Sequence, residues 1–340
     1  MRDTGPRAAR VGVAAGGVGE KDSERTIGPD YARAPEYDPA PDVPRGTLRS
    51  FVMDSRDSRI YPGIRRIENE VTARRDAYGN RIAAQAHEQS EAEPYLRTVW
   101  VYVPALIGRD RPAPFLVAQD GPLYVNHLPR VLDTLIAARR VPPLVAILVA
   151  SGGGDAQGSQ RGLEYDTLSG TYSDFIETEV LPRVRESAGV TLTDDPDGRA
   201  VMGVSSGAAC AFTMAWFHPE RYRRVLSYSG TYVNQQSPPN PESPRGAWEY
   251  HATLIPNAGK KPLRVWLEVG EKDLHHDDPE ETWHNWPLAN RRMAAALAAK
   301  GYDYRFTFSL GGRHADPRVL EQTFPEALEW LWHGYSPATA

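Results

Sequence analysis

The sequence of 340 residues predicts an α/β protein with a mostly parallel central sheet that helices cover on both faces. Short apolar segments typical of buried strands alternate along the chain with segments typical of helices. The segment 144–150 is apolar throughout, as expected of a central parallel strand. A G-x-S-x-G pattern at 203–207 lies between a predicted strand and a predicted helix. We therefore expect functional residues where the strands end, at the carboxyl edge of the sheet.

Three regions are expected along the chain. Residues 1–45 are rich in Gly, Ala, Pro and charge, which predicts a flexible extension. The folded domain is expected over residues 46–335, with a polar surface insertion at 62–94. Strands are predicted at 47–53, 98–103, 114–118, 144–150, 200–204, 224–229, 263–269 and 304–308. Helices are predicted at 127–139, 172–186, 208–216, 288–300 and 323–332.

Composition excludes several classes of partner. The formal net charge of −5 indicates no basic surface, so we expect no nucleic acid partner. No run approaches the ~18 apolar residues of a membrane span, and no membrane association is expected. The N-terminus lacks the apolar core of a signal peptide, which favours a cytoplasmic location. Cys210 is the sole cysteine and is expected to be a buried structural thiol.

Ser205 is the predicted nucleophile. An apolar run ending at Val204 and a helix-forming run beginning at Ala208 place the serine on a tight strand-to-helix turn. Such a turn needs small neighbours, and Gly203 and Gly207 supply them. The N-terminus of the following helix favours negative charge that develops beside the hydroxyl.

Two later loops supply partners for this serine, which needs a base and a group that orients the base. The loop after the strand at 263–269 contains Asp273, and the loop after the strand at 304–308 contains His314. We predict that His314 is the base and that Asp273 orients it. The same acidic loop holds three further carboxylates, Glu271, Asp277 and Asp278.

A serine nucleophile also needs backbone N–H groups that stabilise the oxyanion of the tetrahedral intermediate. The N–H of Ser206 is the expected first donor, because this residue directly follows the nucleophile. The second donor is expected from the loop after the strand at 114–118, which reads QDGPL.

The segments QDG, GVSSG, GEKD and GGRH, in this order, resemble the putative-esterase family. That family includes enterochelin esterases, esterase D, feruloyl and acetylxylan esterases, and the mycolyltransferases. The resemblance covers residues 95–335 and implies an α/β-hydrolase fold. It also implies no metal or other cofactor, a small-molecule ester as substrate, and a triad of Ser205, Asp273 and His314.

The loop around Pro122 departs from the family pattern. In several relatives the residue after Asp-Gly supplies the second oxyanion N–H, but proline has none. We therefore expect Gly121 or Leu123 to serve instead.

An Arg-x-x-Glu-Tyr element begins at Arg161, as in similar enterochelin-esterase-like proteins. We expect Arg161 to pair with Glu164 and to brace the rim of the site, with substrate contact as the alternative for both residues. Aromatic residues also lie in loops near this edge, and of these Tyr232 and Trp286 are candidate substrate contacts. Packing within a lid is the alternative for these rings.

Two other segments contain residue types that occur in cofactor sites. The run His275-His276-Asp277-Asp278 carries metal-ligating side chains, but adjacent residues rarely converge on one ion, so a solvated loop is expected. The glycine-rich segment 151–158 lacks the Gly-Lys-Ser/Thr of a phosphate loop, so no nucleotide is expected.

These patterns predict a serine hydrolase that cleaves a carboxylic ester through an acyl-enzyme, of the enterochelin esterase-like or carbohydrate/feruloyl type. Three alternatives remain open at this point. They are an acyltransferase with the same triad, a non-catalytic binding domain on a hydrolase scaffold, and a metal-dependent hydrolase.

Overall fold

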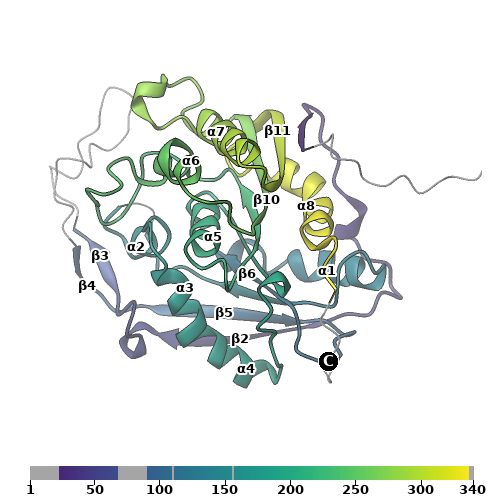
Figure 1. Cartoon of the computed structure of the whole chain (residues 1–340). Helices are drawn as coiled ribbons and strands as arrows, with labels where there is room; N and C mark the ends of the chain where they lie inside the picture. The colour runs from purple at the N-terminus through teal and green to yellow at the C-terminus, as the bar shows by residue number, and fades with distance from the viewer. Residues whose placement is uncertain (1–22, 68–89, 109–110, 155–156, 337–340) are drawn as a thin grey trace, which may run out of the picture.

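The computed structural model describes residues 23–67, 90–108, 111–154 and 157–336. Its centre is a sheet of nine strands in the order β1-β11-β10-β9-β8-β6-β7-β5-β2 (Figure 1). All neighbouring pairs from β1 to β7 in this order are parallel, whereas β5 pairs antiparallel with both β7 and β2. The predicted α/β class and mostly parallel sheet are confirmed.

The strands of this sheet are β1 (Glu24–Ile27), β2 (Thr47–Asp54), β5 (Leu96–Val103), β6 (Phe115–Gln119), β7 (Val145–Val149), β8 (Arg199–Val204), β9 (Arg224–Tyr228), β10 (Arg264–Lys272) and β11 (Asp303–Arg313). The α-helices are α1 (Leu128–Ala137), α2 (Gln160–Tyr165), α3 (Thr171–Phe175), α4 (Leu181–Ala188), α5 (Ser206–Phe217), α6 (Ile255–Asn257), α7 (Trp286–Ala299) and α8 (Pro317–Trp332). A π-helical turn at Ile176–Val180 joins α3 to α4, where a single helix was predicted.

Helices cover both faces of the sheet, because successive side chains of the central strands point to opposite sides and both sets are apolar. Alternate residues of β6 illustrate the division. Leu116 and Ala118 pack in the cluster that contains α1 and α8, whereas Phe115 and Val117 pack in the cluster that contains α3, α4, α5 and α7.

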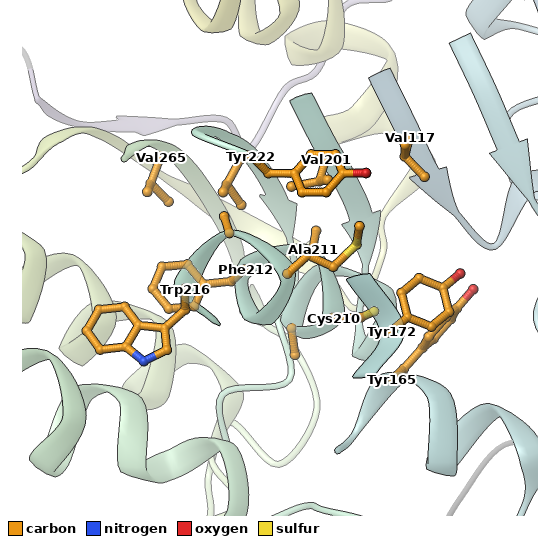
Figure 2. Close-up of a cluster of buried hydrophobic side chains, with 14 of the residues drawn as sticks. Val117, Tyr165, Tyr172, Val201, Cys210, Ala211, Phe212, Trp216, Tyr222 and Val265 are labelled. Carbon is orange, nitrogen blue, oxygen red and sulfur yellow. The ribbon is translucent and has the colours of Figure 1, made fainter. Parts of the chain in front are cut away.

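Helix α5 lies at the middle of the larger cluster and is buried from Ser206 to Trp216. Figure 2 shows its side chains grouped with Val117, Val201 and Val265 from three strands of the sheet. Cys210 belongs to this helix, is 1% exposed, and has a pKa raised by burial. The predicted buried, structural thiol is therefore confirmed.

The boundary expected at residue 45 needs correction. Glu24–Ile27 forms β1, which pairs in parallel with β11 at the edge of the main sheet. Arg25 also forms an ion pair of 2.7 Å with Glu326 on α8. The described part of residues 1–45 is therefore packed on the domain, while residues 1–22 lie outside the described residues.

The polar insertion expected at 62–94 begins and ends in a small antiparallel ladder. Its two strands are β3 (Ile64–Arg66) and β4 (Ser90–Ala92). Residues 68–89 of the insertion lie outside the described residues. Among the described residues, none of the helices has both the length and the apolar character that a bilayer crossing requires.

Candidate active site

Ser205 occupies a strained turn between β8 and α5. Its backbone has φ 59° and ψ −129°, a conformation that non-glycine residues rarely adopt. Its N–H donates to the carbonyl of Tyr228 at 3.0 Å, which ties the turn to the end of β9. The side chain is half-buried, so its hydroxyl stands at the carboxyl edge of the sheet with access to solvent. This geometry agrees with the strand-turn-helix context of the G-x-S-x-G pattern.

Strand register brings the two predicted partners together. β10 and β11 run in parallel, and Lys272 near the end of one pairs with Arg313 at the end of the other. The next residues along the two strands are Asp273 and His314, so both side chains emerge at the same point of the edge. β11 extends five residues beyond the predicted strand end, and this extension carries His314 to that point.

The three side chains form a continuous chain of contacts. The Nε2 atom of His314 lies 3.0 Å from the Oγ atom of Ser205. The Nδ1 atom of the same ring lies 2.6 Å from Oδ1 of Asp273. The spacing and order match those of a Ser-His-Asp triad, in which the acid orients the base and the base accepts the serine proton.

The environment of Asp273 suits an orienting role. Its side chain is 0% exposed, and its Oδ1 also accepts a hydrogen bond of 2.7 Å from the N–H of Leu274. Its Oδ2 has no hydrogen-bond partner among the described residues. The carboxylate is thus held through one oxygen, and that oxygen contacts the imidazole. Glu271, one of the other carboxylates of this loop, accepts instead from the N–H of Gly311 at 2.8 Å.

Glu268 lies below this loop, within β10. It is fully buried and accepts a hydrogen bond of 2.8 Å from the hydroxyl of Ser309 on β11. Burial, together with the nearby charge of Asp273, raises the pKa of the Glu268 carboxyl to about 8. Glu268 is therefore largely protonated at pH 7.

Thr231 is a site residue that the sequence analysis missed. Its Oγ1 lies 3.3 Å from Oγ of Ser205, and its N–H donates to the Ser205 carbonyl at 3.2 Å. The loop after β9 carries it to the same edge. Only its position after a predicted strand end could have pointed to it, since no motif includes it.

The backbone N–H groups of Ser206, Gly121 and Leu123 are the oxyanion donors expected from the sequence. Ser206 is the first residue of α5, so its N–H has no acceptor within the helix and lies beside the nucleophile. Leu123 donates its N–H to the carbonyl of Asp120 at 2.9 Å within a 3-10 turn. Gly121 is therefore the better candidate of the predicted pair.

The turn that carries Gly121 is held by an ion pair that the sequence analysis did not predict. Asp120 has a left-handed backbone (φ 57°), and its N–H donates to the hydroxyl of Tyr165 at 3.0 Å. Its carboxylate accepts two hydrogen bonds from Arg161, at 3.1 and 2.8 Å. The expected pairing of Arg161 with Glu164 is therefore wrong.

Glu164 instead pairs with Arg97 on β5. Arg97 Nη1 donates to Glu164 Oε2 at 3.0 Å, and Nη2 contacts the other oxygen. Both side chains are almost fully buried, and Gln160 also donates to Glu164 at 2.8 Å. A buried glutamate with these partners braces the wall behind the site, and it is not placed to contact a substrate.

The two aromatic candidates for substrate contact, Tyr232 and Trp286, lie in different surroundings. Tyr232 is 0% exposed, donates its hydroxyl to Ser227 at 2.9 Å, and packs edge-on against Phe212 in the core, so its expected role as a substrate contact is wrong. Trp286 is 5% exposed and begins α7. Its ring lies edge-on to His314, with centroids 6.1 Å apart. Trp286 therefore forms a wall beside the imidazole.

The histidine and aspartate side chains of the loop 275–278 contact one another. His275 Nδ1 lies 2.9 Å from Oδ2 of Asp278, and His276 Nε2 lies 3.1 Å from Asp277. The ring of His275 also stacks on Trp286 at 5.7 Å. No group of three or more His, Cys, Asp or Glu side chains arranged to hold a metal ion occurs within the described residues.

The chain is similar to known esterases in sequence and in fold. The family described as Putative esterase matches residues 90–331. The chain belongs to this family. The iron(III) enterobactin esterase of Dickeya dadantii (strain 3937) is 25% identical over 260 residues, which cover 74% of this chain and 55% of the relative. That of Escherichia coli (strain K12) is 28% identical over 147 residues, which cover 42% of this chain and 34% of the relative. The chain thus spans about half the length, or less, of these curated relatives.

Solved structures of esterases have the same α/β-hydrolase fold. The enterobactin esterase FES from Shigella flexneri matches with a TM-score of 0.56 and 18% identity, over 86% of this chain and 61% of that one. The ferulic acid esterase AmCE1/Fae1A from Anaeromyces mucronatus matches with a TM-score of 0.54 and 11% identity, over 89% and 96%. At these identities the likeness establishes the fold alone.

Proposed function

We propose that the protein hydrolyses a carboxylic ester, with Ser205 as nucleophile, His314 as general base and acid, and Asp273 as the orienting carboxylate. The observation that carries this proposal is the unbroken chain of contacts from Ser205 Oγ through His314 to Asp273, at 3.0 and 2.6 Å. Membership of an esterase family supports the same reaction class.

The reaction proceeds by double displacement. Nε2 of His314 accepts the proton of the Ser205 hydroxyl as Oγ attacks the ester carbonyl. The N–H groups of Ser206 and Gly121 stabilise the oxyanion. The alcohol leaves with the proton from His314, and the acyl group stays on Ser205. A water molecule then attacks the acyl-enzyme as His314 takes its proton, and the bond between the acyl group and Ser205 Oγ breaks. His314 returns the proton to Oγ, and the acid is released. Side chains and backbone supply every group that these steps need.

Small aryl-bearing esters are the first substrates to assay. Curated relatives are iron(III) enterobactin esterases, and one solved structure of the Shigella enzyme was obtained in the presence of enterobactin. Other neighbours with this fold are ferulic acid esterases. Enterobactin and a feruloyl ester therefore form the core of the panel, with p-nitrophenyl acetate as a generic reporter.

Hydrolysis of p-nitrophenyl acetate by the whole chain, combined with fluorophosphonate labelling, tests the proposal. Ser205→Ala is expected to lower kcat about 10⁶-fold and to abolish labelling, because it removes the hydroxyl that contacts the base His314. Ser169→Ala removes a loop hydroxyl that contacts only Thr171 at 2.9 Å and serves as the matched control. Full activity of Ser205→Ala, or an unlabelled wild type, would refute the assignment and favour a non-catalytic binding domain.

Acyl transfer uses the same triad and differs only in the acceptor that attacks the acyl-enzyme. Product analysis in the presence of glycerol or a sugar separates the two reactions. We expect the free acid as the main product. A dominant transesterified product would assign the site to acyl transfer.

A further inference from the structure

A pocket lies at the edge of the sheet opposite the triad. Its volume is about 270 Å³, and it is lined by the first residues of three strands, Arg224 of β9, Arg264 of β10 and Asp303 of β11. The strands are parallel, so their first residues lie at the edge away from Asp273 and His314. β10 has nine residues, which at ~3.3 Å per residue separates the two sites by about 30 Å.

Positive charge dominates this pocket. Its lining includes four cationic side chains, Arg223, Arg224, Lys260 and Arg264, against two carboxylates, Asp197 and Asp303. The lining therefore carries two more positive than negative charges when His333, which also lines the pocket, is counted as neutral. Lys260 is exposed and makes no hydrogen bond or ion pair with any described residue. Its charge is thus uncompensated.

Arg224 is the most unusual member of the set. It is 7% exposed, yet it donates hydrogen bonds to backbone carbonyls, to that of Asp197 at 2.6 Å and also to that of Leu331. Within the described residues it forms no ion pair with a carboxylate. Burial lowers its pKa, and the neighbouring charge of Arg264 lowers it further. A bound anion would offset both effects, because a nearby negative charge favours the charged guanidinium.

The arginines are held rigidly. Arg264 donates its Nε to the carbonyl of Trp330 at 3.0 Å, contacts Asp303, and stacks over the Trp330 ring at 3.9 Å. Arg224 lies over the rings of Trp332 and Tyr335, each at 5.6 Å. Contacts with the last carbonyls of α8 give both guanidinium groups a role in capping that helix. Arg223 pairs with Asp197 at 2.9 Å, but neither capping nor this pair explains why Lys260 faces the same space.

We propose that this pocket binds a small phosphate-bearing anion, held by Arg224, Arg264, Lys260 and Arg223. A phosphate group carries about −1.5 to −2 charges at pH 7, which matches the excess of two positive charges, whereas a single carboxylate balances only one. Arginine forks pair well with phosphate oxygens, and preorganised guanidinium groups lose little entropy when they bind. The volume suits inorganic phosphate or a small phosphate monoester.

Isothermal titration of the full chain with sodium phosphate, at constant ionic strength in chloride buffer, tests the proposal. We expect saturable one-site binding that Lys260→Met weakens by about fivefold or more, because one charge-assisted contact is lost. Arg223→Gln is a second variant with the same expected direction. Arg130 lies on α1 and forms an exposed ion pair with Asp38. Arg130→Gln removes one charge from this pair, is the matched control, and should bind phosphate as the wild type does.

Parallel titrations with glycerol phosphate and with acetate identify the ligand class. Binding of glycerol phosphate as well as inorganic phosphate assigns a phosphate monoester, and binding of inorganic phosphate alone assigns free phosphate. Acetate that binds as tightly as phosphate would overturn the phosphate assignment. Absence of saturable phosphate binding, an unaffected Lys260→Met variant, or an equal loss in Arg130→Gln would overturn the site.

Discussion

A Cβ atom on Gly203 would lie 2.2 Å from the backbone carbonyl carbon of Gly207, because α5 begins directly above the end of β8. No side chain fits between these two segments. The surroundings of Gly207 are looser, since a Cβ there would lie 3.2 Å from Oδ2 of Asp120 and from Cβ of Gln119. The two glycines of the G-x-S-x-G pattern therefore have different reasons to be small.

Substitution of these glycines by alanine should separate the two cases. Gly203→Ala is expected to destabilise the protein by about 3 kcal/mol or more, since backbone must move to accept the methyl group. Gly207→Ala should change stability by less than about 1 kcal/mol, because the better helix propensity of alanine offsets the tighter contact. Urea unfolding followed by circular dichroism measures both values. Equal losses would contradict the contact geometry.

Asp273→Asn tests the role of the buried carboxylate. The amide keeps the shape but no longer holds the productive tautomer of His314, so kcat for p-nitrophenyl acetate should fall about 10⁴-fold. Asp277→Asn is the matched control, because Asp277 lies in the same loop and its side chain is 87% exposed. Its activity should be that of the wild type. A larger effect of Asp277→Asn would move the orienting role to that residue.

Arg161 is expected to act as a positioning residue through Asp120. Arg161→Gln removes both hydrogen bonds to the Asp120 carboxylate and should cost about 2 kcal/mol of stability. The turn that carries Gly121 then loosens, so kcat should fall by up to about 100-fold with little change in KM.

Two further variants show whether this effect belongs to the Asp120 contact. Arg161→Lys restores the charge without the forked geometry and should give an intermediate kcat. Arg245→Gln breaks a pair with Glu249 away from the triad and should leave kcat unchanged. If Arg161→Gln lowers stability but leaves kcat intact, the pair serves the fold only.

Local patterns in the sequence were sufficient for the main elements and for the candidate triad. The apolar strands, the order of the motifs and the strand ends predicted where Ser205, Asp273 and His314 lie, because parallel strands end at one edge. β1 was missed because four residues, Glu24–Ile27, carry too short a pattern to distinguish from an extended tail.

Partner choice among polar side chains could not be predicted. Arg161 and Glu164 lie close in sequence, but the fold offers Asp120 to the first and Arg97 to the second. Tyr232 follows a strand end like a site residue, yet its ring enters the core between helices that are distant in sequence. These choices depend on tertiary packing and leave no periodic signal.

Glu268 should make stability depend on pH. Its pKa in the folded protein is about 8, above the ordinary value of 4.5, so the folded state holds a proton that the unfolded state releases between these values. The contribution is full below about pH 4.5 and is lost as pH rises through 8, at up to about 1.4 kcal/mol per pH unit.

Glu268→Gln isolates this contribution, because glutamine is neutral at every pH and can still accept the hydrogen bond from Ser309. The free energy of unfolding is measured by urea denaturation at pH 6, 7, 8 and 9. It should fall with rising pH more in the wild type than in the variant, so that the difference between the two changes in favour of the variant. Glu271→Gln, at a half-buried position near the end of β10, controls for the loss of one carboxylate and should not reproduce this trend. Parallel curves for Glu268→Gln and the wild type would mean that Glu268 is already ionised in the folded protein at pH 6.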